Sequence, residues 1–185
     1  MPSPIIHLSV GAFTHGALKR RWRDATPLRR TAYVLAFLFF AMMPDLDSVI
    51  GIALNDLGRF HNNIAHSFGF ALIAGCAAWL LAPLFGERKR RFWAAVVFGS
   101  YAGHILLDAI TRGRGVMLFW PITDLRIQPP FQIFYGLQWS HGLVSIEHFV
   151  TAGTEGLVVL LVAWLVLRLR RKGISKTDHG ITNTD

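Results

Sequence analysis

The sequence has little charge and almost no cysteine. Only 16% of its 185 residues are charged, whereas 52% are hydrophobic, and soluble domains carry about 25% charged residues. The mean hydropathy is +0.40, an apolar excess that favours a membrane protein over a small soluble domain. Cys76 is the only cysteine, which excludes an intramolecular disulfide and a thiolate metal cage. It lies in the apolar run 68–85, where we expect it to pack as a small hydrophobic residue.

Acidic residues are also scarce: the chain has 11 Asp and Glu against 19 Lys and Arg, giving a net charge of +8. In a soluble protein this excess would suggest nucleic-acid binding. Most of the basic residues, however, form short runs at 19–30, 87–91 and 168–172, each beside an apolar segment. Such runs are typical of the cytoplasmic flanks of membrane helices, so we expect the lipid bilayer and no nucleic acid as a stable partner. The charges near the N-terminus follow the first apolar stretch, which is not the pattern of a signal peptide.

Membrane-embedded segments are the main feature of the chain. The candidates are 4–18, 31–54, 68–85, 92–110 and 148–167. A helix needs about 20 apolar residues to cross a bilayer; the last three segments approach that length, while the first is short enough to lie in the interface instead. Pro44 predicts that the second segment kinks or ends near Met43. The sequence therefore predicts an all-α polytopic membrane helix bundle with about five membrane-embedded segments.

The basic runs also predict domain organisation and orientation. Residues 1–172 form one membrane-embedded domain, and 173–185 are expected to be a disordered cytoplasmic tail. If all three runs face the cytoplasm, the segments alternate in direction, with the N-terminus outside and the C-terminus inside. The loops 55–67 and 111–147 then lie on the outer side. The second is rich in aromatic residues and proline, and we expect it to form a cover at headgroup level.

Ionisable residues of different segments are predicted to reach one depth. Counted from the nearest basic run at about 1.5 Å per residue, His7, Asp45, His104 and Asp108 lie about 18 to 25 Å into the membrane. His66, just before segment 68–85, should lie near the outer surface. The hydrocarbon core is about 30 Å thick, so these groups share its outer third. This coincidence predicts a polar site toward the periplasmic face.

Each part of this site also has a simpler interpretation. His104 and Asp108 are four residues apart and share a helix face, which suits a helix-stabilising pair as well as a metal site. Asp45 and Asp47 fit the capping of a helix that restarts after the proline. Two carboxylates at membrane depth are nevertheless costly unless they are paired or bind a cation.

The stretch HNNIAHS (61–67) stands at the start of an apolar segment. His61 and His66 are five residues apart and cannot share a helix face, so we predict a loop, with Ser67 capping the following helix. His15 and His179 are expected to be solvated. Nitrogen and oxygen donors without thiolates suit Zn²⁺, Mn²⁺ or Fe, and several carboxylates together favour a centre of two or more ions.

The ordered set of motifs resembles a known family. It consists of His7, PDLD (44–47), HNNIAHS (61–67), HILLD (104–108) and FWP (119–121). Together, over about residues 1–165, they resemble the YdjM-like family, the LexA-regulated, inner-membrane-associated metal-dependent hydrolases of bacteria. The family's HRGxTHS appears here as HNNIAHS, without the arginine that could help to hold an anionic substrate. A looser likeness to the helical zinc-dependent phospholipase C and P1 nuclease group implies phosphoester hydrolysis, and the depth of the site would suit a lipid-linked phosphate.

The leading hypothesis is therefore a metal-dependent hydrolase of the bacterial inner membrane, with zinc as the most suitable metal. The candidate metal ligands are His7, Asp45, Asp47, His61, His66, His104 and Asp108. Asp47 and Asp108 are the candidate catalytic carboxylates. The sequence leaves open whether His7, Asp47, His141 or Glu147 contacts the metal directly.

Two other classes of protein are compatible with the same residues. Intramembrane His and Asp also form proton or cation relays in ion-coupled transporters. Against this, the polar groups cluster at one depth, and no internal repeat of the kind found in many transporters is visible. A non-enzymatic membrane protein with a structural metal site, closed to water, is the other alternative.

Overall fold

The structure, a computed structural model, describes residues 2–56, 61–137 and 146–178, with side chains described as far as Leu169. Its helices are α1 (Pro4–Leu18), α2 (Pro27–Met42), α3 (Leu46–Ala53), α5 (Phe68–Leu81), α6 (Arg90–Ala109) and α7 (Ile146–Asp178). Short 3-10 helices η1 (Lys19–Trp22), η2 (Met43–Asp45) and η3 (Ala82–Phe85) join or extend them. The described residues contain isolated β-bridges and no strand, so the predicted all-α class is confirmed.

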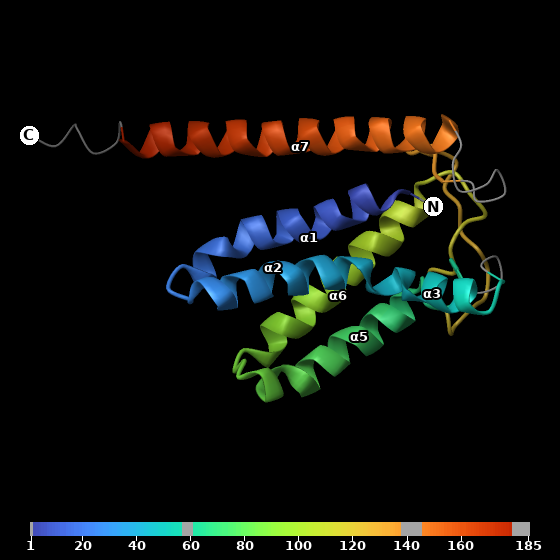
Figure 1. Cartoon of the computed structure of the whole chain (residues 1–185), viewed down its shortest axis with the longest axis horizontal. Helices are drawn as coiled ribbons and strands as arrows, with labels where there is room; N and C mark the ends of the chain where they lie inside the picture. The colour runs from blue at the N-terminus through green and yellow to red at the C-terminus, as the bar shows by residue number, and fades with distance from the viewer. Residues whose placement is uncertain (1, 57–60, 138–145, 179–185) are drawn as a thin grey trace, which may run out of the picture.

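The helices pack as a bundle whose turns gather at its two ends (Figure 1). The main contacts join α5 to α6, α1 to α2 and α2 to α6, while α7 lies along α1. The α1–α2 and α5–α6 connections lie at one end, and α7 runs toward that end. We call it the basic end, because the runs 19–30 and 87–91 are there. At the other end lie α3 and the long connection between α6 and α7.

Stretches long and apolar enough to cross a membrane agree with the polytopic prediction. They are Pro27–Ala53, Phe68–Phe85, Arg90–Ala109 and Ile146–Leu169. The first stretch is not one straight helix: α2 ends at Met42, and η2 precedes α3. Proline removes a backbone donor and clashes with the preceding turn, so Pro44 breaks the segment where predicted. Helix α1, with 15 residues, is shorter than these stretches and packs against α2.

Helix starts follow local capping chemistry. Ser3, Thr26 and Ser67 are N-caps whose side-chain oxygens accept from backbone N–H groups of the first turn. The predicted cap at Ser67 is confirmed by the 3.2 Å bond from the Phe70 N–H to Ser67 Oγ. A cap of this kind contributes about 1 kcal/mol, and here it fixes where α5 begins beside the HNNIAHS loop.

Glycine allows two close backbone approaches that position the site. A Cβ on Gly11 of α1 would lie 2.5 Å from the carbonyl oxygen of Phe37 on α2. A Cβ on Gly69 of α5 would lie 2.4 Å from the carbonyl oxygen of Trp120 in the long connection between α6 and α7. Real Cβ atoms do not approach so closely, so any larger residue would push α1 from α2, or the connection from α5.

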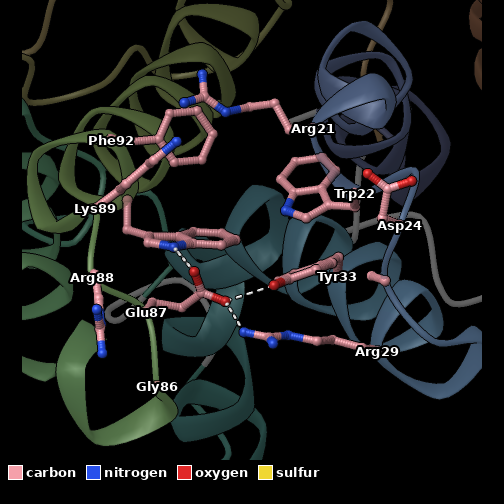
Figure 2. Close-up of a pocket in the computed structure, with 12 residues that line it drawn as sticks. Arg21, Trp22, Asp24, Arg29, Tyr33, Gly86, Glu87, Arg88, Lys89 and Phe92 are labelled. Carbon is pink, nitrogen blue, oxygen red and sulfur yellow. Dashed lines mark hydrogen bonds and ion pairs between the residues drawn. The ribbon is translucent and has the colours of Figure 1, made fainter.

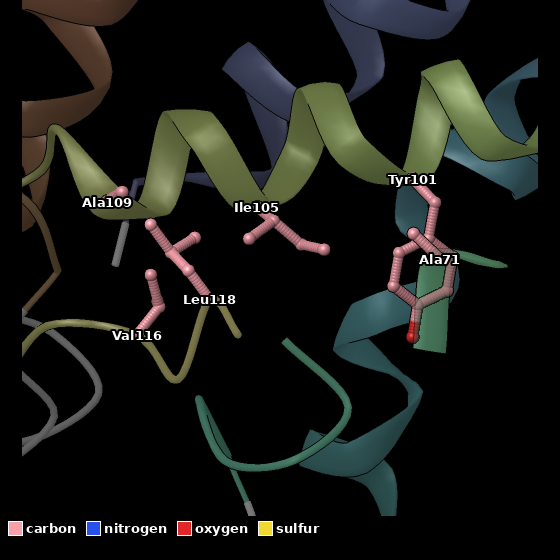
Figure 3. Packing of buried hydrophobic residues seen from close by; sticks show 6 residues of the cluster. All are labelled: Ala71, Tyr101, Ile105, Ala109, Val116 and Leu118. Carbon is pink, nitrogen blue, oxygen red and sulfur yellow. The ribbon is translucent and has the colours of Figure 1, made fainter. Parts of the chain in front are cut away.

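A hydrophobic cluster lies between α5, α6 and the α6–α7 connection (Figure 3). It consists of Ala71, Tyr101, Ile105, Ala109, Val116 and Leu118. The Phe68 N–H donates to the Leu118 carbonyl at 2.9 Å. The expected place of this connection at headgroup level stays a prediction. This connection folds back into the core, although Phe119, Ile122 and Leu125 remain exposed.

Three smaller expectations are corrected. Helix α7 continues to Asp178, so the expected disordered tail is helical at 173–178, and the rest of it lies outside the described residues. Cys76 is exposed on α5 and is not part of the buried core. His15 is only partly solvated: it is half-buried, because its ring stacks on Trp22 at 5.6 Å and contacts Phe37 at 5.7 Å. His179 lies outside the described residues.

Candidate metal centre

The predicted polar residues gather at the end of the bundle opposite the basic end. His7 comes from α1, Asp45 from η2, Asp47 from α3, His61 and His66 from the loop before α5, and His104 and Asp108 from α6. Continuous side-chain contacts join all seven. We call this set the His–Asp cluster. The helical rise that placed these residues at one depth therefore led to the correct neighbourhood.

One group of four donors forms the buried part of the cluster. Asp108 Oδ2 lies 3.0 Å from His66 Nε2 and 3.4 Å from His104 Nε2. Asp45 Oδ1 lies 3.3 Å from His104 Nε2 and 3.5 Å from His66 Nε2. One donor atom from each of the four residues lies within 4.8 Å of the others, which is compact enough for all four to reach a single ion.

A second group of four overlaps the first. Asp47 Oδ1 lies 2.8 Å from His61 Nδ1, and Asp47 Oδ2 lies 3.0 Å from His66 Nδ1. Asp45 Oδ1 completes the group at 3.9 Å from His61 Nδ1. Asp45 and His66 belong to both groups. A carboxylate can bridge two neighbouring ions, so Asp45 makes the two groups compatible with a centre of two ions.

The hydrogen bonding of the cluster tests whether a metal fits. These buried atoms have no hydrogen-bond partner among the described residues: both ring nitrogens of His7 and His66, Nε2 of His61 and His104, Oδ1 of Asp45, Oδ2 of Asp47 and both oxygens of Asp108. They approach each other closely, but not with hydrogen-bond geometry. A buried polar atom without a partner costs about 1–3 kcal/mol, and several in one place call for a shared partner. A divalent cation satisfies these lone pairs together, so the donor set fits a metal.

His104 is oriented for ligation by the backbone of α2. Its Nδ1 lies 2.7 Å from the carbonyl oxygen of Ala41. A carbonyl only accepts, so Nδ1 carries the proton and Nε2 presents its lone pair to Asp45 and Asp108. A metal-bound histidine commonly has its second nitrogen held in this way.

The loop 61–67 folds against the bundle: His66 is fully buried, whereas Ile64 is exposed. The Tyr101 hydroxyl on α6 donates to the Ala65 carbonyl at 2.8 Å and joins the loop to the bundle. The expected depth of His66, near the outer surface of the membrane, stays a prediction. Burial opposes protonation of His66, but Asp108, Asp45 and Asp47 outweigh burial and raise the pKa of His66 well above its usual range. Protons and a metal therefore compete for this ring.

The carboxylates of PDLD do not serve as helix caps. Asp45 is the N-cap residue of α3, yet its side chain accepts no capping hydrogen bond. Asp47 Oδ1 lies 2.8 Å from His61 Nδ1, and Ser48 Oγ lies 2.6 Å from the same nitrogen. Both carboxylates are thus directed at the histidines, which disfavours the simpler interpretation.

The remaining candidates differ in how close they come to the donor groups. The His7 ring stacks on His104, and His7 Nε2 lies 3.6 Å from Asp108 Oδ1. His7 is therefore adjacent to the first group without being part of it. Glu147, in the first turn of α7, belongs to neither group, and His141 lies outside the described residues.

Sequence reasoning missed a buried glutamate on α7. The Glu155 side chain is fully buried and accepts from the Ser3 backbone N–H at 2.9 and 3.0 Å and from the Ser3 hydroxyl. It ties α7 to the first turn of α1, one helical turn before His7. A charged residue inside an apolar segment is itself a signal of function, and this signal could have identified Glu155.

Two arginines of the α6–α7 connection were also missed. Arg114 donates to the His61 carbonyl. Arg126 donates to the Asn62 carbonyl at 2.7 Å and to Asn63 Oδ1 at 3.3 Å. Burial and the neighbouring charge of Arg114 lower the pKa of Arg126. The connection therefore brings two cationic side chains to the loop that carries His61 and His66.

Fold and site together define a multi-pass helical membrane protein with a buried group of histidines and aspartates able to hold a metal ion. The chain matches the model of the family described as YdjM inner membrane protein over residues 1–177, and it belongs to this family. It is also similar to the inner membrane protein YbcI of Escherichia coli (strain K12), with 26% identity over 149 residues, 71% of this chain and 82% of that protein. No solved structure matches.

Proposed function

We propose that this protein is a metal-dependent hydrolase of the inner membrane that cleaves a phosphoester or a lipid-linked phosphate. The observation that carries the proposal is the pair of overlapping donor groups that share Asp45 and His66. These donors would hold a divalent ion, with zinc the best match to the donor set, which would supply a water of lowered pKa and a Lewis acid for a phosphoryl oxygen.

The cluster has a closed side and a more open side. The side chains of His66, His104 and Asp108 are 0% exposed, whereas those of Asp45 and Asp47 are 12% and 9% exposed. Water and a substrate would therefore approach past the two carboxylates of PDLD. This asymmetry supports an enzyme, because a catalytic metal site keeps one position open to water or substrate.

The two candidate catalytic carboxylates differ in position. Asp47 lies at the more open edge, hydrogen-bonded to His61, where it is suited to accept a proton from an attacking water. Asp108 is surrounded by the Nε2 atoms of His7, His66 and His104. We therefore assign proton transfer to Asp47, and ligation and charge balance to Asp108.

The surroundings favour an anionic substrate with an apolar part. Arg114 and Arg126 place positive charge beside the His61–Asn63 backbone, and arginine suits phosphate recognition. On α3, next to Asp47, Val49 and Ile50 are 62% and 51% exposed. These apolar side chains would contact the acyl or prenyl chain of a lipid-linked substrate. The site would open toward the periplasmic face, the orientation that the basic runs favour.

The test is hydrolysis by purified, zinc-loaded protein on phosphomonoesters, phosphodiesters and lipid-linked phosphates, with and without chelator. Asp47→Asn should lower turnover per bound metal by about 100-fold or more, the usual effect of losing a general base. Asp124→Asn, which changes an exposed carboxylate of the α6–α7 connection, is the matched control. Inactivity of the wild type on the whole panel, or hydrolysis that neither chelator nor Asp47→Asn reduces, would contradict the proposal.

A further inference from the structure

A polar cavity lies at the basic end of the bundle, the end opposite the His–Asp cluster; Figure 2 shows the residues that line it. Its volume is about 390 Å³, and it is lined by residues between Arg21 and Tyr33 and between Gly86 and Trp93. Cavities of about 300–1,000 Å³ hold small ligands or parts of larger ones. The hydrolase proposal gives this cavity no role.

The spanning stretches fix the depth of this cavity. One starts at Pro27, one ends at Phe85 and one starts at Arg90. The residues that line the cavity lie at these boundaries or a few positions away from them. It therefore lies where the apolar part of the bundle ends, which is the level of the lipid headgroups, whichever way the protein is oriented.

One acidic residue in the wall of the cavity, Glu87, already forms an ion pair with Arg29. Glu87 accepts from Arg29 at 2.9 Å, from the Tyr33 hydroxyl at 2.6 Å and from Trp93 Nε1 at 3.0 Å. Dashed lines mark these bonds in Figure 2. Because three donors surround Glu87, it is not available to other cations of the lining.

Further cations line the same cavity. The Arg21 guanidinium lies 4.3 Å from the centre of the Phe92 ring. Arg88 and Lys89 are exposed, and their side chains form no ion pair with the described part of the chain. Asp24 is the other acidic side chain of the lining. Positive charge is therefore in excess around a cavity whose walls also carry the aromatic ring of Trp22.

We propose that this cavity binds the phosphate headgroup of an anionic phospholipid. Arg88, Lys89 and Arg21 would contact the phosphate through charge-assisted hydrogen bonds, while Trp22 and Phe92 would contact the glycerol and the first acyl carbons. Basic cavities between membrane helices on the cytoplasmic side commonly bind such headgroups. The lipid would hold the ends of α2 and α6 together beside the Glu87 contacts.

The experiment compares lipid selectivity of the full chain in phosphatidylcholine vesicles containing a small fraction of spin-labelled phosphatidylglycerol. The immobilised fraction of the label gives the preference for the anionic lipid. Arg88→Gln/Lys89→Gln should reduce this preference about tenfold, as expected for losing one or two charge-assisted contacts. Arg21→Gln should also reduce the preference for the anionic lipid.

The matched control is Arg90→Gln/Arg91→Gln, which removes the same charge from neighbouring positions outside the cavity lining. It should leave the preference nearly unchanged, and millimolar inorganic phosphate should not displace the lipid. Equal losses in the two double variants would show general surface electrostatics and overturn the proposal. Displacement by inorganic phosphate would assign the cavity to a soluble anion and would overturn it as well.

Discussion

The imidazole ring of His7 on α1 stacks on that of His104 on α6, with ring centres 3.5 Å apart and planes 12° from parallel. Neither ring nitrogen of His7 has a hydrogen-bond partner among the described residues, and Nε2 faces Asp108. Through this contact the N-terminal helix becomes part of the wall of the His–Asp cluster.

His7→Phe should separate stacking from ligation. Phenylalanine keeps a ring against His104 but removes the nitrogen that faces Asp108. We expect zinc affinity to fall about 10- to 100-fold, the range for groups that support a metal ligand, measured by competition with a chromophoric chelator. His15→Phe on the same helix is the control and should leave affinity unchanged. If His7→Phe also binds zinc as the wild type does, His7 acts only through packing.

Glu155 and Ser3 should act as one unit. Glu155→Gln weakens the contact that holds the start of α1, and Ser3→Ala removes its hydroxyl donor. Each should lower zinc affinity about threefold to tenfold by loosening His7, and the double variant should lose little more, since contacting residues are not additive. Thr154→Val, which removes a hydroxyl that donates to the Val150 and Thr151 carbonyls of α7, should have no effect. Additive losses would show that the two residues act independently.

Glu87 gives a pH dependence of stability. Burial opposes its charged form, but the hydrogen bonds from Tyr33, Trp93 and Arg29 outweigh burial and lower the pKa of Glu87 below its usual range. A lowered folded-state pKa contributes stability above the unfolded value of about 4.3, and this stability is lost as pH falls through the folded pKa.

Glu87→Gln should therefore lower the free energy of unfolding by about 1 kcal/mol at pH 7. The difference from the wild type should shrink steadily below about pH 4. Thermal unfolding in detergent at several pH values measures this. A difference that stays constant down to pH 3 would mean that the charge of Glu87 is not the stabilising feature.

The membrane orientation is a prediction from the basic runs, and the directions of the helices in Figure 1 are compatible with it. Reporter fusions at Gly86 and Lys172 should both report cytoplasm, and a fusion at Gln128 in the α6–α7 connection should report the opposite side. A cytoplasmic signal at Gln128 would place the His–Asp cluster on the cytoplasmic side and exclude a periplasmic substrate.

The residues that gather at the site could be predicted from the sequence because two regular features of the α-helix were enough: its rise per residue and its periodicity. Helical rise gave His7, Asp45, His104 and Asp108 one depth, and a spacing of four residues put His104 and Asp108 on one face. Pro44 gave the break between α2 and α3 for an equally local reason.

Features that depend on long-range packing could not be predicted in this way. The burial of His66 depends on Tyr101, which is 36 residues further along the chain. The contact between Ser3 and Glu155 joins residues 152 apart. Arg114 and Arg126 reach the His61–Asn63 backbone only because the α6–α7 connection folds back onto the bundle. No local sequence pattern indicates contacts between residues so far apart in the chain.

The metal content of the purified protein tests the central claim most directly. Protein purified in detergent without added chelator should contain about one to two equivalents of a transition metal, zinc foremost, by plasma mass spectrometry. His104→Ala should lose most of it, whereas His15→Ala, which changes a histidine of the basic end, should retain it. Trace metal in the wild type that zinc dialysis does not raise, or equal losses in the two variants, would contradict the assignment of the His–Asp cluster as a metal centre.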